Sequence, residues 1–217
     1  MTKTSCAARW LRRSAIALVV VGLSLLGWAL AANLNTRVYQ ARQERAFSPV
    51  TKRDPATRIS ADPLVLGRIE IPRIGVTAIV REGDDDTTLA IAVGHITGTA
   101  LPGERGNMAL AGHRDSFFRE LRGIRRNDTI RFVTPVRSYE YVVDSTEVVG
   151  PRDVRVLDPT DDTVLSLVTC FPFSYVGRAP KRFIVRASLV APLPEPADGG
   201  DELQASATFT HGERTQR

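Results

Sequence analysis

Cysteine is scarce in this chain, which has only Cys6 and Cys170 among 217 residues. Acidic residues are scarce in its first part, because residues 1–60 hold ten Lys and Arg but only Glu44 and Asp54. The residues after position 60 carry 19 basic and 22 acidic groups, a net charge of −3, although the whole chain has a formal charge of +5. The basic excess therefore belongs to the N-terminal segment, and it indicates membrane topology rather than a nucleic-acid partner.

A second absence is local: residues 14–36 contain no charged side chain over 23 positions. A helix of this length can cross a hydrocarbon core, which needs about 20 residues, and the basic residues before it favour a cytoplasmic N-terminus. A cleaved signal peptide is the alternative, because Ala29–Ala32 includes the small residues of a cleavage site. The apolar run is longer than a usual signal-peptide core and favours an uncleaved anchor. On either interpretation, the chain after about residue 37 lies outside the cytoplasm.

Composition divides the chain into five parts. A content of 43% hydrophobic and 24% charged residues is enough for one ordinary domain with appendages. A polar, basic stretch with two prolines follows the apolar run, and the last 27 residues, rich in Pro, Ala, Gly, Glu and Thr, are predicted to be disordered. The expected parts are a cytoplasmic basic segment 1–13, a transmembrane anchor 14–36, a stalk 37–62, an exported domain 63–190 and a tail 191–217.

The exported domain is predicted to be mostly β, because short apolar alternations separated by turn residues run from Leu64 to Leu189. The predicted strands are 65–72, 77–80, 107–113, 128–134, 138–150, 163–170 and 182–190. A short N-capped helix is expected at about Thr88 to Val93, and a helical turn at 116–124. Seven or eight short strands with few helices indicate a closed or nearly closed β-barrel.

Cys170 is an unpaired cysteine outside the cytoplasm, because Cys6 lies on the other side of the membrane or is removed with a signal peptide. An oxidising compartment normally pairs its thiols. Cys170 is therefore an inert buried residue, a site of intermolecular pairing or a thiol kept free for chemistry. The cysteine count alone leaves all three open.

His113 and Cys170 each end an apolar strand, in "ALAGHRD" and "SLVTC" respectively. If the two strands are parallel neighbours, the imidazole and the thiol emerge at the same end of the sheet. A histidine there can accept the thiol proton and protonate a leaving group. The alternative is a hydrogen-bonded structural histidine.

Arg182, Ile184 and Arg186 share one face of the last predicted strand, because side chains alternate along a strand. A guanidinium near the thiol would favour the thiolate and bind the oxyanion of an acyl-transfer intermediate. The alternative for Arg182 is a solvated charge at the end of a strand.

These motifs together resemble the signature of the sortases, which are membrane-anchored cysteine transpeptidases. "VTC" is followed twelve residues later by Arg182 within "PKRFIVRA", and "AGHRD" precedes both. The stretches "GHITGTALPGERGNMALAGHRDSFFREL" and "VTCFPFSYVGRAPKRFIVRASL" are most similar to class D sortases, and the likeness runs from about Leu64 to Leu189. One departure is Ser166 in "SLVTC", where many relatives have threonine; it should not affect the chemistry.

The resemblance implies an eight-stranded sortase β-barrel after one transmembrane helix, with the active site at one end of a groove. By matched position, Cys170 is the nucleophile, His113 the acid and base, and Arg182 the stabiliser of substrate and oxyanion. The implied substrates are exported proteins with a C-terminal sorting motif like Leu-Pro-x-Thr-Gly, and the implied acceptor is an amine of a cell-wall precursor or of a protein lysine. The implied location is the bacterial cytoplasmic membrane, with the N-terminus inside and the catalytic domain outside.

Four further residues are candidates for lining the groove: His95, Thr169, Arg114 and Arg186. A structural role is preferred for His95, because only His113 has the "AGHRD" context. Arg186 is the rival of Arg182, which opens its strand nearer to the expected position of Cys170. No cofactor and no metal are expected, since the acidic "GDDD" at 83–86 fits a helix cap better than a calcium loop.

Two other functions fit parts of the pattern. A papain-like hydrolase also pairs cysteine with histidine, but its cysteine comes first in the chain and usually opens a helix. Here Cys170 follows both a strand and His113. A non-catalytic, membrane-tethered barrel that binds peptide or glycan, with an inert Cys170, is the alternative outside the enzymes.

Overall fold

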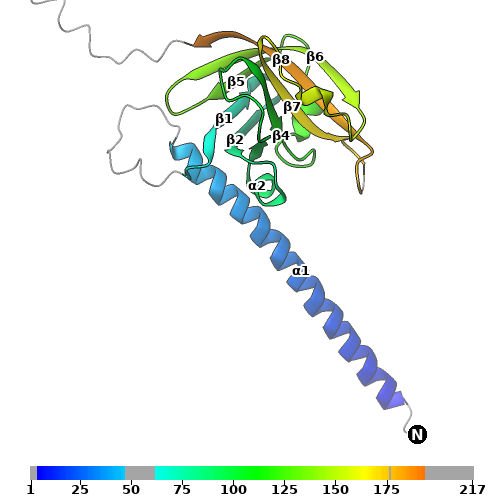
Figure 1. Cartoon of the computed structure of the whole chain (residues 1–217). Coiled ribbons are helices and arrows are strands. Elements are labelled where there is room, and N and C mark those ends of the chain that lie inside the picture. The colour runs from blue at the N-terminus through cyan, green and yellow to red at the C-terminus, as the bar shows by residue number, and fades with distance from the viewer. Residues whose placement is uncertain (1–3, 47–61, 176, 194–217) are drawn as a thin grey trace, which may run out of the picture.

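The computed structural model describes residues 4–46, 62–175 and 177–193 (Figure 1). A single long helix, α1 (Thr4–Ala46), precedes the β domain, and by length and composition its residues Trp10–Gln43 can cross a membrane. The helix continues without a break through the first ten residues of the predicted stalk. The rest of that stalk up to residue 61, and the predicted tail from residue 194 onward, lie outside the described residues.

The domain is a closed eight-stranded β-barrel, as the resemblance implied. Around the barrel the strands follow the order β1-β2-β3-β4-β7-β8-β6-β5. Their bounds are β1 (Val65–Ile71), β2 (Val76–Glu82), β3 (Val93–His95), β4 (Gly106–Ala111), β5 (Thr129–Val133), β6 (Ser138–Val149), β7 (Thr163–Phe171) and β8 (Lys181–Leu193). Only β2 with β3 and β4 with β7 pair in parallel; the other neighbours are antiparallel.

The barrel interior is filled by alternate apolar residues of the strands, such as Leu165 and Leu167 of β7 and Val185 of β8. Each fully buried Leu or Val stabilises the fold by about 1.5–3 kcal/mol relative to exposure. Tyr141 also lies inside the barrel, and burial raises its pKa to about 12. The amide of Gly103 donates to its hydroxyl oxygen, so this polar group is not left unpaired.

The short helix α2 (Asp86–Ile91) begins two residues before the predicted Thr88. The reason is its cap: the Asp85 carboxylate accepts hydrogen bonds from the backbone amides of Thr87 and Thr88. Hydrogen bonds from the Thr87 and Thr88 hydroxyls hold the pKa of Asp85 below its ordinary value. The acidic cluster therefore caps a helix, as predicted.

The described part of the domain also has three short 3₁₀ helices: η3 (Pro72–Ile74), η4 (Arg119–Gly123) and η5 (Val154–Leu157). The predicted helical turn at 116–124 corresponds to η4, whose flanking Phe118 is fully buried. The strand β3 and the helix η5 were not predicted. Each has three or four residues, too few for a periodic pattern to be recognised.

Candidate active site

The strands that carry His113 and Cys170 are parallel neighbours, which confirms the topology on which the sequence argument depended. The β4–β7 register pairs Ala111 with Val168, and the Gly112 amide donates to the Val168 carbonyl just beyond it. His113 and Cys170 therefore emerge at the same end of the sheet. In this structure the His113 side chain is exposed and Cys170 is half-buried.

Arg182 lies directly across from Cys170, because the β7–β8 register pairs these two residues. Residues paired across an antiparallel ladder project from the same face, so the guanidinium and the thiol share the outer face of the barrel. Arg186 pairs with Ser166 instead, four residues further along β8. At about 3.3 Å per residue, Arg186 lies about 13 Å along β8 from the position opposite Cys170, and this geometry favours Arg182 over its rival.

The guanidinium of Arg182 is held near the strand end by the backbone. Its Nη1 donates to the Lys181 carbonyl at 3.1 Å and to the Ala179 carbonyl at 3.4 Å. Both acceptors are neutral carbonyls, and among the described residues no carboxylate forms an ion pair with Arg182. The charge is therefore available to an anionic group that forms beside Cys170.

Thr169 and Gly112 fix the backbone from which His113 and Cys170 project. The Thr169 hydroxyl donates to the Gly112 carbonyl at 2.7 Å, and the Thr169 side chain is only 2% exposed. A Cβ on Gly112 would approach the buried ring of Phe118 to 2.6 Å, so only glycine fits there. Thr169 was predicted to line the groove; this geometry gives it a positioning role instead.

Arg114 holds the connection between β7 and β8. Its guanidinium donates to the backbone carbonyls of Pro172 at 3.1 Å, Tyr175 at 2.7 Å and Gly177 at 3.0 Å, and lies 5.9 Å from the centroid of the Tyr175 ring. The prediction placed Arg114 against the substrate. The structure has its donors engaged with the loop that leads from Cys170 to Arg182.

His95 is part of the barrel wall. It is 2% exposed, with Nδ1 at 2.7 Å from Glu82 Oε2 and Nε2 at 3.0 Å from both the Ala100 carbonyl oxygen and Thr99 Oγ1. Both ring nitrogens therefore have oxygen partners inside the protein. This supports the structural role that the sequence favoured for His95, rather than a place in the substrate groove.

A polar network that sequence reasoning missed ties η5 to the outer face of β4 and β7. The Ser166 hydroxyl donates to Asn107 Oδ1 at 2.7 Å, and Asn107 Nδ2 donates to the carbonyls of Val156 at 2.9 Å and Asp158 at 3.2 Å. Arg186 Nη2 reaches the Val156 carbonyl at 3.5 Å. The only sequence signal was a polar residue within each apolar strand, Asn107 in one and Ser166 in the other.

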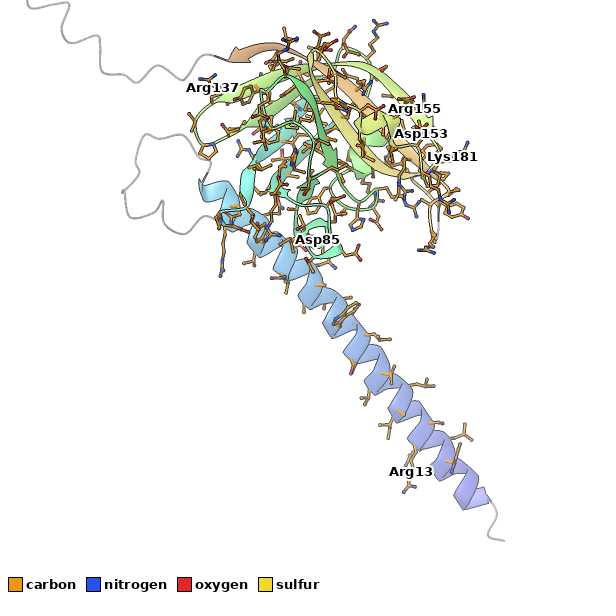
Figure 2. All side chains as sticks on the ribbon, viewed as in Figure 1. Arg13, Asp85, Arg137, Asp153, Arg155 and Lys181 are labelled. Carbon is orange, nitrogen blue, oxygen red and sulfur yellow. The ribbon has the colours of Figure 1, made fainter. Side chains whose placement is uncertain are left out.

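The β6–β7 connection thus lies against the same outer face that carries the catalytic candidates. Figure 2 shows Asp153 and Arg155 of this connection and Lys181 of β8 on the same side of the barrel. Val156 packs with Ile184 and Val168, which stand between the Cys170–Arg182 pair and Arg186. The apolar middle of this outer face is therefore covered by η5, and the thiol and the guanidinium lie at its end.

This arrangement fits nucleophilic chemistry at a carbonyl. It combines an unpaired thiol, an exposed imidazole from the neighbouring strand end and a guanidinium opposite the thiol, which are the groups that covalent acyl transfer needs. Among the described residues no hydrogen bond joins the thiol to the imidazole, and no group of three or more His, Cys, Asp and Glu is arranged to hold a metal ion.

Comparisons with known proteins give a consistent picture. The family model described as the Sortase domain matches residues 69–190. "Sortase D" of Bacillus subtilis is 33% identical over 147 residues, covering 67% of this chain and 69% of that protein. "Sortase A" of Listeria monocytogenes is 30% identical over 110 residues, about half of each chain.

Solved structures resemble the domain as well. A Sortase D5 transpeptidase from Clostridium perfringens is similar with a TM-score of 0.58 and 27% identity, covering 71% of this chain and 98% of that one. Sortase E from Streptomyces avermitilis is similar with a TM-score of 0.53 and 30% identity, covering 59% of this chain and 90% of that one. In each comparison the similarity spans most of the solved domain.

Proposed function

Because this chain belongs to the sortase family, we propose that it is a membrane-anchored transpeptidase of the class D type, with Cys170, His113 and Arg182 as its catalytic residues. The observation that carries the assignment is the pairing of Cys170 with Arg182 across β7 and β8, beside strand β4, whose last residue Ala111 is followed two positions later by His113. The relative at 33% identity, a Sortase D, supports the class.

In the first half-reaction, Cys170 Sγ attacks the carbonyl carbon of a peptide bond in the donor protein. His113 takes the thiol proton and delivers it to the nitrogen of the departing C-terminal fragment, so that a C–N bond breaks as a C–S bond forms. The Arg182 guanidinium donates hydrogen bonds to the carbonyl oxygen as its negative charge develops. The product is a thioacyl enzyme and a free amine.

In the second half-reaction, an acceptor amine attacks the thioester carbonyl. His113 removes the proton of the attacking amine and returns it to the departing Cys170 sulfur, which restores the thiol and leaves an amide. An amine is a better nucleophile than water towards a thioester, so transfer outpaces hydrolysis where the site holds the amine. We propose a cell-wall precursor or a protein lysine as acceptor, and an exported protein with a C-terminal Leu-Pro-x-Thr-Gly-like motif as donor.

The membrane topology completes the proposal. Residues 1–13 lie in the cytoplasm, residues 14–36 of α1 span the membrane, and the domain of residues 63–190 lies outside. The basic residues that precede the apolar run support this orientation. The site then faces the compartment through which exported proteins pass.

A fluorogenic sorting peptide tests the function, assayed with the full chain in detergent, with and without an added amine. The expected result is cleavage that needs Cys170 and yields the amine adduct. A thiol-directed vinyl sulfone should label wild type at Cys170 and not label Cys170→Ala. Cleavage without adduct would indicate a cysteine hydrolase. No cleavage and no labelling of the folded protein would indicate a binding module.

A further inference from the structure

The C-terminal part of α1 lies against the barrel, although the sequence predicted a stalk there. The Thr36 hydroxyl donates to the Ala90 carbonyl at 3.1 Å. The Gln40 side chain makes two bonds: Nε2 donates to the Ile91 carbonyl at 2.6 Å, and Oε1 accepts from the Ile79 amide at 2.9 Å. Figure 1 shows α1 passing α2 as it leaves the domain.

Gln40 pairs two backbone groups that the secondary structure leaves open. Ile91 is the last residue of α2, so its carbonyl has no partner within the helix. The β2–β3 ladder starts only at Val80 and Val93, so the Ile79 amide lies just before it. Ile79 is fully buried, and an unpaired amide there would be costly. The Gln40 side chain of the anchor helix therefore provides hydrogen-bond partners for both of these backbone groups.

A second set of hydrogen bonds begins at Tyr39, the residue before Gln40. The Tyr39 hydroxyl donates to Asp62 Oδ2 at 2.9 Å, and Arg81 Nε donates to the same oxygen at 3.0 Å. Arg81 Nη1 also donates to Thr88 Oγ1 in α2 at 2.7 Å. Burial alone would raise the pKa of Asp62, but hydrogen bonds from Leu64, Tyr39 and Arg81 hold it below its ordinary value. The helix thus joins a charged network of the domain.

Strand pairing places the Gln40 contact with Ile79 in the same row of the sheet as Cys170. One register runs from β2 through β3 and β4 to β7. When this register is extended to the strand ends, four residues fall in one row across the sheet: Ile79, Ala92, His113 and Cys170. Three strand spacings of about 4.8 Å separate the two ends of the row, about 14 Å along the sheet.

We propose that Thr36, Tyr39 and Gln40 dock the anchor helix onto the barrel, so that anchor and domain form one rigid unit with its catalytic end held close to the membrane surface. The inference rests on the proposed function. Thr36 is the last residue of the proposed span, and Gln40 follows about 6 Å further along the helix axis. Gln40 is then a positioning residue: it sets the height of Cys170, and the scissile bond of a preferred donor lies near the bilayer.

The test uses the full chain in vesicles of phosphatidylcholine and phosphatidylglycerol. The donor is a reporter with a sorting motif, a spacer and a transmembrane helix, made with a spacer of about 3 residues or of about 20, which reaches about 70 Å when extended. Wild type should cleave the short-spacer reporter on the order of tenfold faster than the long one. A soluble sorting peptide is assayed in parallel.

Gln40→Ala should reduce the spacer preference to about twofold or less while cleaving the soluble peptide at the wild-type rate. Thr36→Val, which loses the hydrogen bond to the Ala90 carbonyl as well as the one to the Ala32 carbonyl within α1, should reduce the spacer preference in part. Arg42→Ala is the matched control, because Arg42 is an exposed neighbour on the same helix, and it should keep the preference. Amide exchange at Ile79 should quicken in Gln40→Ala and stay slow in the control.

An unchanged spacer preference in a folded Gln40→Ala, or no preference in wild type, would overturn the docking inference and leave the proposed function intact. An equal loss with the reporters and the soluble peptide would overturn it too, because Gln40 would then support only the fold. If wild type cleaves neither reporter nor peptide, the proposed function itself fails and the inference fails with it.

Discussion

Two Gly-His pairs lie at the ends of the adjacent strands β3 and β4, and they have different surroundings. His95 ends β3, is 2% exposed and contacts oxygen atoms of three residues through its two ring nitrogens. His113 follows β4, is exposed, and stands beside an unpaired thiol. The same residue type thus lies hydrogen-bonded within the wall in one region and exposed at a strand end in the other.

The difference shows what a reactive histidine requires here. An imidazole whose nitrogens are both engaged cannot exchange protons with a substrate without breaking buried hydrogen bonds. An imidazole at a strand end keeps both nitrogens accessible, while its backbone is fixed by Gly112 and Thr169. Substitutions at the two histidines should therefore separate activity from stability.

The largest effect is expected for His113→Ala. General acid–base catalysis contributes about 10²- to 10⁴-fold, so kcat/KM for the sorting peptide should fall by about three orders of magnitude. The denaturant midpoint should stay at the wild-type value, because His113 is exposed. A His113→Ala enzyme with near-normal kcat/KM would remove His113 from the mechanism.

The next largest effect is expected for Arg182→Lys. A lysine keeps the charge but loses the forked donors, and loss of an oxyanion donor costs about 10²- to 10³-fold in kcat. Arg186→Lys is the matched control on the same face of β8 and should lower kcat less. Steady-state kinetics of both variants show which arginine stabilises the oxyanion. A larger loss of kcat in Arg186→Lys than in Arg182→Lys would reverse the assignment.

His95→Leu should give the opposite result from His113→Ala. The leucine removes the imidazole from the Ala100 carbonyl oxygen and from Glu82 Oε2, and such a loss at a buried side chain costs about 1–3 kcal/mol. The free energy of unfolding of the β domain, measured by urea titration of the full-length protein, should fall by that amount. Activity per folded molecule should be retained; its complete loss in a stable variant would place His95 in the active site.

A smaller effect on both activity and stability is expected for Thr169→Val. The valine keeps the shape but loses the hydrogen bond to the Gly112 carbonyl, which costs about 1 kcal/mol. Because that bond fixes the backbone before His113, kcat should fall severalfold while KM changes little. Thr169→Ser restores the hydroxyl and should recover kcat. If Thr169→Ser stays as slow as Thr169→Val, the hydroxyl does not position His113.

The smallest effect concerns pH and lies away from the site. The Arg73 guanidinium donates to Asp128 and holds the pKa of that carboxyl below its ordinary value. A lowered carboxyl pKa adds stability above the ordinary value of about 3.9, and this stability disappears as the pH falls through the lowered folded value. Urea midpoints between about pH 2 and pH 6 should show a smaller decline at low pH in Asp128→Asn than in wild type. If the urea midpoints of wild type and Asp128→Asn decline equally at low pH, the Arg73–Asp128 pair does not contribute to the pH dependence of stability.

Much of this could be predicted from the sequence, because the signals were local. The apolar run, the alternating strands and the histidine, cysteine and arginine motifs are contiguous patterns, and they led to a barrel with three named site residues. The adjacency of His113 and Cys170 depended on an assumed parallel pairing, since 57 positions separate them in the chain.

Other features had no sequence signal. The strand β3 is only three residues long. Its pairing with β2 and β4 depends on the closure of the barrel, and its own composition does not reveal it. The partners of Gln40 are two backbone groups more than 35 residues away, and backbone acceptors and donors are the same at every residue. The polar network of Asn107 and Ser166 depends likewise on strand order.

The central claim is tested most directly by the intact mass of the enzyme during turnover of a sorting peptide. We expect an adduct with the mass of the acyl fragment on Cys170, which disappears when an amine is added as an equal amount of amide product forms. The adduct should be absent from Cys170→Ala. Amide product formed by Cys170→Ala, or an acyl adduct located on any other residue, would contradict the account.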